Sequence, residues 1–157
     1  MAEYHLAQVN IARMRDTLNG PAMAGLVKRI GEMNQLAEGS EGFVWRFKGE
    51  ATPETLSVFK GYFEPFEPEK LFYNLSVWRS VDDLQNYVFR TTHAEMFRGK
   101  AGWMDAFDRA HLALWWIPAG HAPTIAESAE RLRAVDARGP TPFAFSFRNS
   151  FPKPHLG

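Results

Sequence analysis

The sequence contains no cysteine, no surplus of charge of either sign and no long hydrophobic run. Without cysteine there is no disulfide, no thiolate zinc site and no cysteine nucleophile. The 18 basic and 18 acidic residues cancel, whereas a nucleic-acid-binding protein carries a basic surplus. No apolar run approaches the ~20 residues of a membrane helix, and the first residues lack the order of a signal peptide. These absences predict a cytoplasmic protein that binds neither nucleic acid nor membrane.

Sequence motifs for common cofactors and metals are also missing. No glycine-rich dinucleotide fingerprint, phosphate-binding loop or Gly-x-Ser-x-Gly turn occurs, which argues against nicotinamide, ATP and serine-hydrolase chemistry. The five histidines form neither an i, i+4 pair nor a His-x-His motif, so no metal site is predicted.

What the chain has in excess is aromatic residues, with 13 Phe, 5 Trp and 4 Tyr among 157 residues. A chain of this length forms one domain with a sizeable core, so residues 1–157 are predicted to be a single domain. Most of the aromatic residues are expected in that core, because each buries a large apolar area. Trp45, Trp78 and Trp115 are the tryptophans we expect beside a flat aromatic ligand.

Hydrophobic periodicity predicts strands and helices in a definite order. The expected strands are residues 4–11, 42–48, 71–78 and 111–117. Helices are expected from Pro21 to the stop at Gly39, after the caps Ser80 and Thr92, and from Thr124 to Arg138. Residues 49–70 are a long connection whose Phe-rich part is either a lid or a dimer arm, and residues 140–157 are a C-terminal extension.

This order corresponds to an α+β fold of the ferredoxin-like split β-α-β-β-α-β type, with an antiparallel sheet and helices on one face. The last strand is apolar on both sides, since Trp115 and Trp116 point in opposite directions. Both faces of the sheet are therefore expected to be buried. We expect a second copy of the chain to cover the helix-free face, giving a homodimer through that face.

Residues 74–87 together with His93 resemble the third-strand and second-helix signature of the dimeric α+β barrel superfamily. That superfamily includes the antibiotic-biosynthesis monooxygenases and relatives that handle haem or chlorite. Over its whole length the chain resembles an uncharacterised bacterial family of the same superfamily, with the matching stretches 4–8, 92–95, 115–121 and 139–145. The resemblance implies a dimeric α+β barrel.

The resemblance also implies a reaction. In the cofactor-free, quinone-forming monooxygenases, an Asn four residues before a Trp on the third strand contributes to the pocket, and Asn74 and Trp78 match that spacing. Such enzymes deprotonate an electron-rich phenol that then reacts with dioxygen, while the protein holds the phenolate and excludes water. His93 follows Thr92 at a helix start, where the helix field favours a neutral imidazole. It is either the general base or a packing residue. The predicted catalytic residues are His93, Asn74 and Trp78.

Several further side chains are predicted to bind the substrate. His5 lies in an apolar strand and needs a partner, which is a protein group or a ligand. Arg90 near the His93 helix is either a receptor for a carboxylate or phenolate or a solvated surface residue. Gln8 with Asn10, and Asn74 with Ser76, share strand faces, and these polar groups either cross-link strands or line a cavity. The predicted substrate-binding residues are His5, Asn10, Trp45, Tyr87, Arg90 and Trp115.

Two classes of function follow from the sequence. The first is a cofactor-independent monooxygenase-like oxidoreductase acting on a small hydrophobic aromatic or polyketide-like molecule. The alternative is a non-catalytic protein that binds haem or another hydrophobic ligand. No cofactor is predicted, although His93, His5 and His111 leave haem open, because haem needs only one axial histidine.

Overall fold

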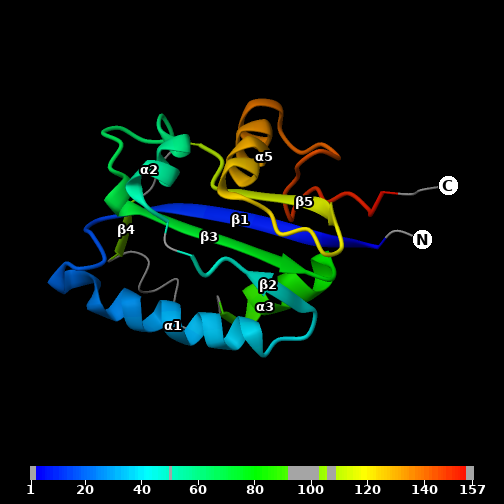
Figure 1. Ribbon diagram of the computed structural model, residues 1–157, viewed down its shortest axis with the longest axis horizontal. Helices are drawn as coiled ribbons and strands as arrows, with labels where there is room; N and C mark the ends of the chain where they lie inside the picture. The colour runs from blue at the N-terminus through cyan, green and yellow to red at the C-terminus, as the bar shows by residue number, and fades with distance from the viewer. Residues whose placement is uncertain (1–2, 50, 92–102, 106–108, 155–157) are drawn as a thin grey trace.

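A computed structural model describes residues 3–49, 51–91, 103–105 and 109–154. The described residues form an α+β fold with one antiparallel sheet of five strands (Figure 1). The elements in chain order, labelled as in Figure 1, are β1 (Tyr4–Met14), α1 (Ala24–Glu38), β2 (Phe43–Arg46), α2 (Pro53–Leu56), β3 (Leu71–Trp78), α3 (Val81–Thr91), β4 (Met104–Asp105), β5 (Leu112–Pro118) and α5 (Ile125–Arg138). Short 3-10 turns occupy Pro21–Met23, Ser57–Phe59 and Pro68–Lys70.

The central strand of the sheet is β1. It pairs antiparallel with β3 on one side and with β5 on the other, and β2 lies beyond β3. The two-residue strand β4 pairs with the end of β1, at Arg13 and Met14. Because β1 has neighbours on both edges and cover on both faces, Leu6, Ala7 and Val9 are fully buried.

One face of the sheet is covered by α1 and α3, which lie together below it in Figure 1. The predicted stripe of α1 buries Leu26 and Ala37, and the helix ends where the backbone N–H of Gly39 donates to the carbonyls of Gln35 and Ala37. On α3, Leu84 is buried against β3 residue Trp78 in a shared hydrophobic cluster. The apolar faces of both helices therefore point at the sheet.

The opposite face is covered by α5 and by residues 53–66 of the same chain, above the sheet in Figure 1. Leu132 and Ala129 of α5 pack there with Phe59 and Tyr62 against Val9 and other odd-numbered residues of β1. The expectation that this face carries no helices is therefore wrong. Helix α5 has an amphipathic pattern that requires burial, and this face supplies it.

The C-terminal segment lies along the outer edge of β5. Phe145 and Leu114 exchange two backbone hydrogen bonds of 2.8 Å, and the indole N–H of Trp116 donates to the carbonyl of Phe151 at 2.8 Å. Trp116 thus packs on the α1–α3 side while Trp115 packs on the α5 side, as their alternation predicts. The extension expected over residues 140–157 is joined to β5 by an isolated antiparallel bridge between Leu114 and Phe145.

Helix starts follow the predicted caps. Ser80 Oγ accepts from the backbone N–H of Asp83 at 3.1 Å, and Thr124 Oγ1 accepts from that of Glu127 at 3.0 Å. The cap expected at Thr92 and the helix after it lie outside the described residues. No helix in the described part of the chain has the length and apolar character needed to cross a membrane.

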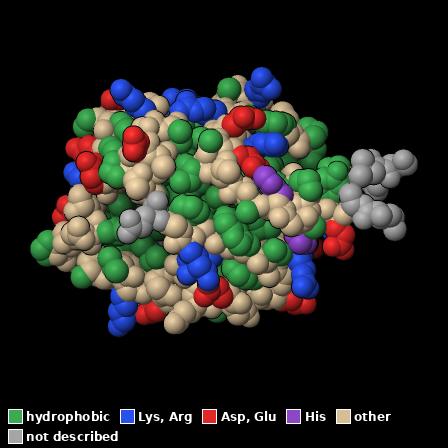
Figure 2. Space-filling view, in the orientation of Figure 1, with side chains coloured by type: hydrophobic (Ala, Val, Ile, Leu, Met, Phe, Trp, Pro, Cys, Tyr) green, Lys and Arg blue, Asp and Glu red, His purple; other side chains and the backbone are tan. Residues whose placement is uncertain are grey.

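The surface seen from the β2 side is mixed. In Figure 2 charged side chains lie mainly towards the periphery of the view, and hydrophobic atoms are exposed near its centre, where β2 and β3 lie in Figure 1. Val44 of β2 is among the exposed large hydrophobic residues.

Candidate functional site

Four polar side chains lie next to one another on the face of the sheet that α1 and α3 cover. In the β1–β3 register, Gln8 is opposite Ser76 and Asn10 is opposite Asn74. Directly opposed residues of an antiparallel pair project to the same face, and so do residues two apart on one strand. We call Gln8, Asn10, Asn74 and Ser76 the polar strip.

The polar strip is internally hydrogen-bonded, with one exception. Gln8 Nε2 donates to Asn74 Oδ1 at 2.5 Å and to Ser76 Oγ at 2.8 Å, and Trp78 Nε1 donates to the same hydroxyl at 2.9 Å. Asn10 Oδ1 is buried and has no hydrogen-bond partner in the described part of the chain. From the sequence, these side chains could either cross-link strands or line a cavity. Gln8 on β1 cross-links to Asn74 and Ser76 on β3, whereas the side-chain oxygen of Asn10 makes no such link.

The strip forms part of the wall of a partly open cavity of about 320 Å³. Apart from Gln8, Asn10 and Asn74, the described lining is mostly apolar and aromatic. It consists of Ile11, Ala12, Leu26, Met33, Phe72, Leu84, Tyr87, Val88, Trp103, Met104, His111, Leu112 and Phe147. Small-molecule pockets have this character, a mainly apolar wall with a few placed polar groups. We call this space the amide cavity.

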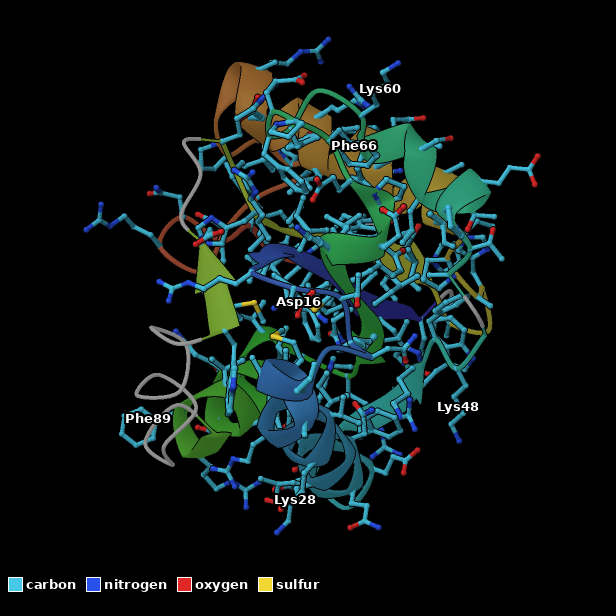
Figure 3. All side chains as sticks on the ribbon, turned by 90° about the vertical axis from the view of Figure 1, so that its left-hand side faces the viewer. Asp16, Lys28, Lys48, Lys60, Phe66 and Phe89 are labelled. Atoms are coloured by element: carbon cyan, nitrogen blue, oxygen red, sulfur yellow. The ribbon has the colours of Figure 1, made fainter. Side chains whose placement is uncertain are left out.

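Two hydrophobic clusters stand at the two ends of the polar strip. Leu6, Trp78 and Leu84 belong to one cluster, and Met14 and Met23 belong to the other. Each cluster closes the space between the sheet and a helix, so the amide cavity lies between two packed regions. Figure 3 shows Lys28 and Phe89 projecting away from the body on the outer sides of α1 and α3, which leaves the inner sides of both helices to face the sheet.

Tyr87 is the polar residue of the helical wall. Its hydroxyl donates to the carbonyl of Met33 at 3.1 Å, and its ring stacks on Trp78 with centroids 5.0 Å apart and planes inclined by 30°. Burial raises the pKa of Tyr87 to about 12. Tyr87 therefore stays protonated at neutral pH and acts as a hydrogen-bond donor, which excludes it as a base there.

Three of the predicted site residues meet at the amide cavity: Asn74, Asn10 and Tyr87. Trp78 is adjacent but fully buried, and its indole N–H is taken by Ser76, so it supports Tyr87 and Ser76 from behind the lining. His93 lies outside the described residues.

The other four predicted residues lie elsewhere. Trp115 packs on the α5 face and donates its N–H to Glu127 Oε2 at 2.9 Å, and Trp45 packs against the same core cluster. Arg90 is exposed and donates to Ser40 Oγ at 3.3 Å. His5 lines a separate, polar hollow of about 580 Å³ together with Glu3, Tyr4, Phe43, Val44, Arg79 and Lys153.

Some lining residues were not predicted as site residues. Phe72 stands two positions before Asn74 on β3, so strand alternation alone places it on the same face. Trp103 falls in the stretch where the helix after Thr92 was expected, and its backbone carbonyl accepts from the backbone N–H of Arg15 at 2.8 Å. Nothing in the local sequence indicates that Trp103 closes the cavity.

Metal ligands do not gather at the amide cavity. In the ranges that the structure describes, no three His, Asp or Glu side chains are placed to hold a metal ion. His111 is the histidine of the described lining.

The fold and site define an α+β protein with a partly open cavity of small-molecule size. The chain belongs to the family described as a domain of unknown function, DUF3291, whose profile matches residues 5–156. Membership of an uncharacterised family is thus confirmed. The crystal structure of the NE2512 protein of unknown function from Nitrosomonas europaea is similar at 13% sequence identity and a TM-score of 0.46, covering 77% of this chain and 94% of that one. No curated protein matches the chain.

Proposed function

We propose that the protein binds a small, mainly apolar aromatic molecule in the amide cavity and oxidises it with dioxygen without a cofactor. One observation carries the binding part: an apolar, aromatic-walled cavity contains hydrogen-bonding amides on its sheet side. Such a wall holds a flat ring by burial and orients it through its polar substituent. In this proposal the protein is a cytoplasmic oxidoreductase.

The size of the cavity supports a ligand of a few fused rings. Its volume of about 320 Å³ lies near the lower end of the range of roughly 300–1,000 Å³ found for ligand pockets. That volume favours a compact aromatic or polyketide-like molecule over the much larger porphyrin.

The proposed reaction converts an activated ring CH₂ group into a carbonyl. Loss of a proton from the phenol or enol gives an electron-rich anion, which reacts with dioxygen. One oxygen atom stays as the new carbonyl, the other leaves as water, and the substrate itself supplies the electrons. Asn74 would hold the anion, His93 would take the proton, and Trp78 would keep Tyr87 and the polar strip in position.

Oxygen uptake by metal-free protein with anthrone as probe tests the oxygenase proposal. We expect protein-dependent formation of anthraquinone with one O₂ consumed per product, and a loss of about tenfold or more in Asn74→Ala or His93→Ala. Asn86→Ala, on the exposed side of α3, is the matched control and keeps full activity. A rate that does not exceed the protein-free rate would refute the oxygenase part.

A second candidate, binding without chemistry, is favoured by a specific observation. The ionisable groups of the described lining are Tyr87 and His111, and the pKa of Tyr87 is raised, which removes it as a base. Equilibrium binding of an aromatic probe with no oxygen uptake would select this candidate. A hemin titration tests its haem form, because an axial histidine shifts the Soret band.

We also propose the finer architecture that the resemblance implies. The strand order β2-β3-β1-β5 fits the split β-α-β-β-α-β plan, with β4 and α5 as additions. In a homodimeric barrel the second face of the sheet would point at the partner copy. Because α5 and residues 53–66 cover that face, they would form part of the dimer interface. Light scattering tests the homodimer: one chain has a mass of 17.9 kDa, and twice that mass is expected.

A further inference from the structure

We propose that Asn10 selects the ligand of the amide cavity, and that this ligand is an aromatic molecule bearing a hydroxyl or N–H group that donates to Asn10 Oδ1. The inference rests on the proposed function, in that it requires an aromatic molecule in the cavity. The inference adds that a hydroxyl or N–H substituent identifies the molecule and that Asn10 is the residue that binds this substituent.

The neighbours of Asn10 are already satisfied. Asn74 stands directly opposite Asn10 in the β1–β3 register, but its Oδ1 accepts from Gln8. The same Gln8 amide and the Trp78 indole both donate to Ser76 Oγ. Among the four residues of the polar strip, Asn10 is therefore the one whose side-chain oxygen is left for a group outside the protein.

An amide oxygen in this position is costly in the empty protein. A buried carbonyl without a partner loses its hydrogen bond to water and gains none in return. Leucine has nearly the shape of asparagine and would fill the same space among Phe72, Leu112 and other apolar neighbours without that cost. A ligand donor placed against Oδ1 removes the penalty, which makes the amide a recognition group.

In the described part of the chain no side chain donates to Asn10 Oδ1, so the donor role is left to the ligand. The Tyr87 hydroxyl, the described donor of the helical wall, is directed to the carbonyl of Met33 on α1. The aromatic side chains Trp103 and Phe72 line the same cavity. An aromatic ring between these side chains would direct a hydroxyl substituent towards β1, where Asn10 lies.

Calorimetric titration with two matched probes, 2-naphthol and 2-methoxynaphthalene, tests the assignment. The probes share a ring system, but only 2-naphthol can donate a hydrogen bond. For the unmodified protein we expect 2-naphthol to bind about fivefold to tenfold more tightly, the effect of one neutral hydrogen bond. In Asn10→Leu the preference should vanish while 2-methoxynaphthalene still binds. Asn149→Leu, in the exposed C-terminal segment, should keep the preference.

A ligand-free measurement checks the same idea independently. Asn10→Leu should leave the urea midpoint of unfolding unchanged or raise it, because it removes a polar atom that has no partner. A lowered midpoint would mean that Asn10 has a structural role, and would overturn the assignment.

The outcomes separate the two proposals. If neither probe binds the unmodified protein, the aromatic-ligand function fails, and the inference fails with it. If both probes bind equally and Asn10→Leu changes nothing, the ligand function stands and only the role of Asn10 is overturned. A preference for 2-methoxynaphthalene would likewise overturn it, because the amide would then present its nitrogen.

Discussion

The hydroxyl of Tyr87 donates to the carbonyl oxygen of Met33 at 3.1 Å and so joins α3 to α1 across the helical wall of the amide cavity. Both residues line the cavity, and the Tyr87 ring is held from behind by Trp78. The bond joins two neutral groups, so its strength changes little with salt or with pH near neutrality. The contact ties the two helices together at the wall of the cavity.

Tyr87→Phe should loosen that wall. The variant loses one partly buried hydrogen bond and leaves the Met33 carbonyl without this donor, so we expect the free energy of unfolding to fall by about 1 kcal/mol. Urea unfolding measures the change, and Tyr4→Phe at the end of β1 is the control. Unchanged stability in Tyr87→Phe would show that the helices are held by packing alone.

Alkaline pH should destabilise the folded protein in a defined window. Burial raises the pKa of Tyr62, Tyr73 and Tyr87 to about 12, against an ordinary value near 10. The folded state therefore holds these protons more tightly than the unfolded state. The resulting stability is complete below pH 10 and is lost as the pH rises towards about 12. Urea midpoints between pH 9 and 11.5 should fall less steeply in Tyr87→Phe than in the unmodified protein.

Strand positions could be predicted well because each strand carries its own hydrophobic pattern. The span of β3 agrees with the expectation, whereas β1 runs three residues further than expected, to Met14. Those three residues, Ala12, Arg13 and Met14, are less apolar as a group, and they are strand because β3 and β4 offer backbone partners there. Tertiary pairing extends the strand beyond its local pattern.

Gln8→Leu should be the most damaging change in the polar strip. Gln8 donates to two acceptors at once, so its loss leaves Asn74 Oδ1 without that partner, at a cost of about 1–3 kcal/mol. Gln85→Leu, exposed on α3, is the matched control and should change stability by less than about 0.5 kcal/mol. Equal effects of the two substitutions would contradict the cross-link.

Two glycines of α1 should respond differently to alanine. Gly31 has open space around it, so Gly31→Ala should stabilise the protein by about 1 kcal/mol through helix propensity. A Cβ at Gly25 would lie 2.9 Å from Cζ2 of Trp103, so the indole or the helix has to shift. Gly25→Ala should therefore gain no stability, and it should weaken probe binding in the cavity that Trp103 lines. Urea unfolding and calorimetry compare the pair directly.

Acid should release the contact between α5 and the start of β5. Hydrogen bonds from the Arg109 guanidinium, with help from the Ala110 backbone N–H, hold the pKa of Asp136 below its ordinary value. The ionised carboxylate of Asp136 therefore stabilises the folded protein fully above the unfolded-state pKa near 3.9. This stabilisation is lost as the pH falls through the lower pKa of the folded state. Asp136→Asn should be less stable than the unmodified protein at pH 7, and the difference should narrow below pH 4. A constant difference would contradict the assignment.

The candidate site was predictable only in part, for a physical reason. Alternation on single strands places Gln8 with Asn10 and Asn74 with Ser76, and these did meet. Which amide bonds to which depends on the β1–β3 register, and a shift of two residues would exchange their partners. The same limit applies to α5, whose pattern requires burial but does not specify which face of the sheet provides it. Trp115 and Trp45 were consequently expected beside a ligand, although they belong to the face that α5 covers.

The position of β1 in the sheet has a consequence for how the chain acquires its structure. This strand precedes both of its main partners in chain order, and they follow only at residues 71–78 and 112–118. Until those segments have been synthesised, an apolar strand that includes Leu6, Val9 and Ile11 has neither edge paired. Contacts so distant in sequence slow folding, and the unpaired strand is exposed to wrong partners during that time. During synthesis, β1 therefore gains its second neighbour only after β5 has been made.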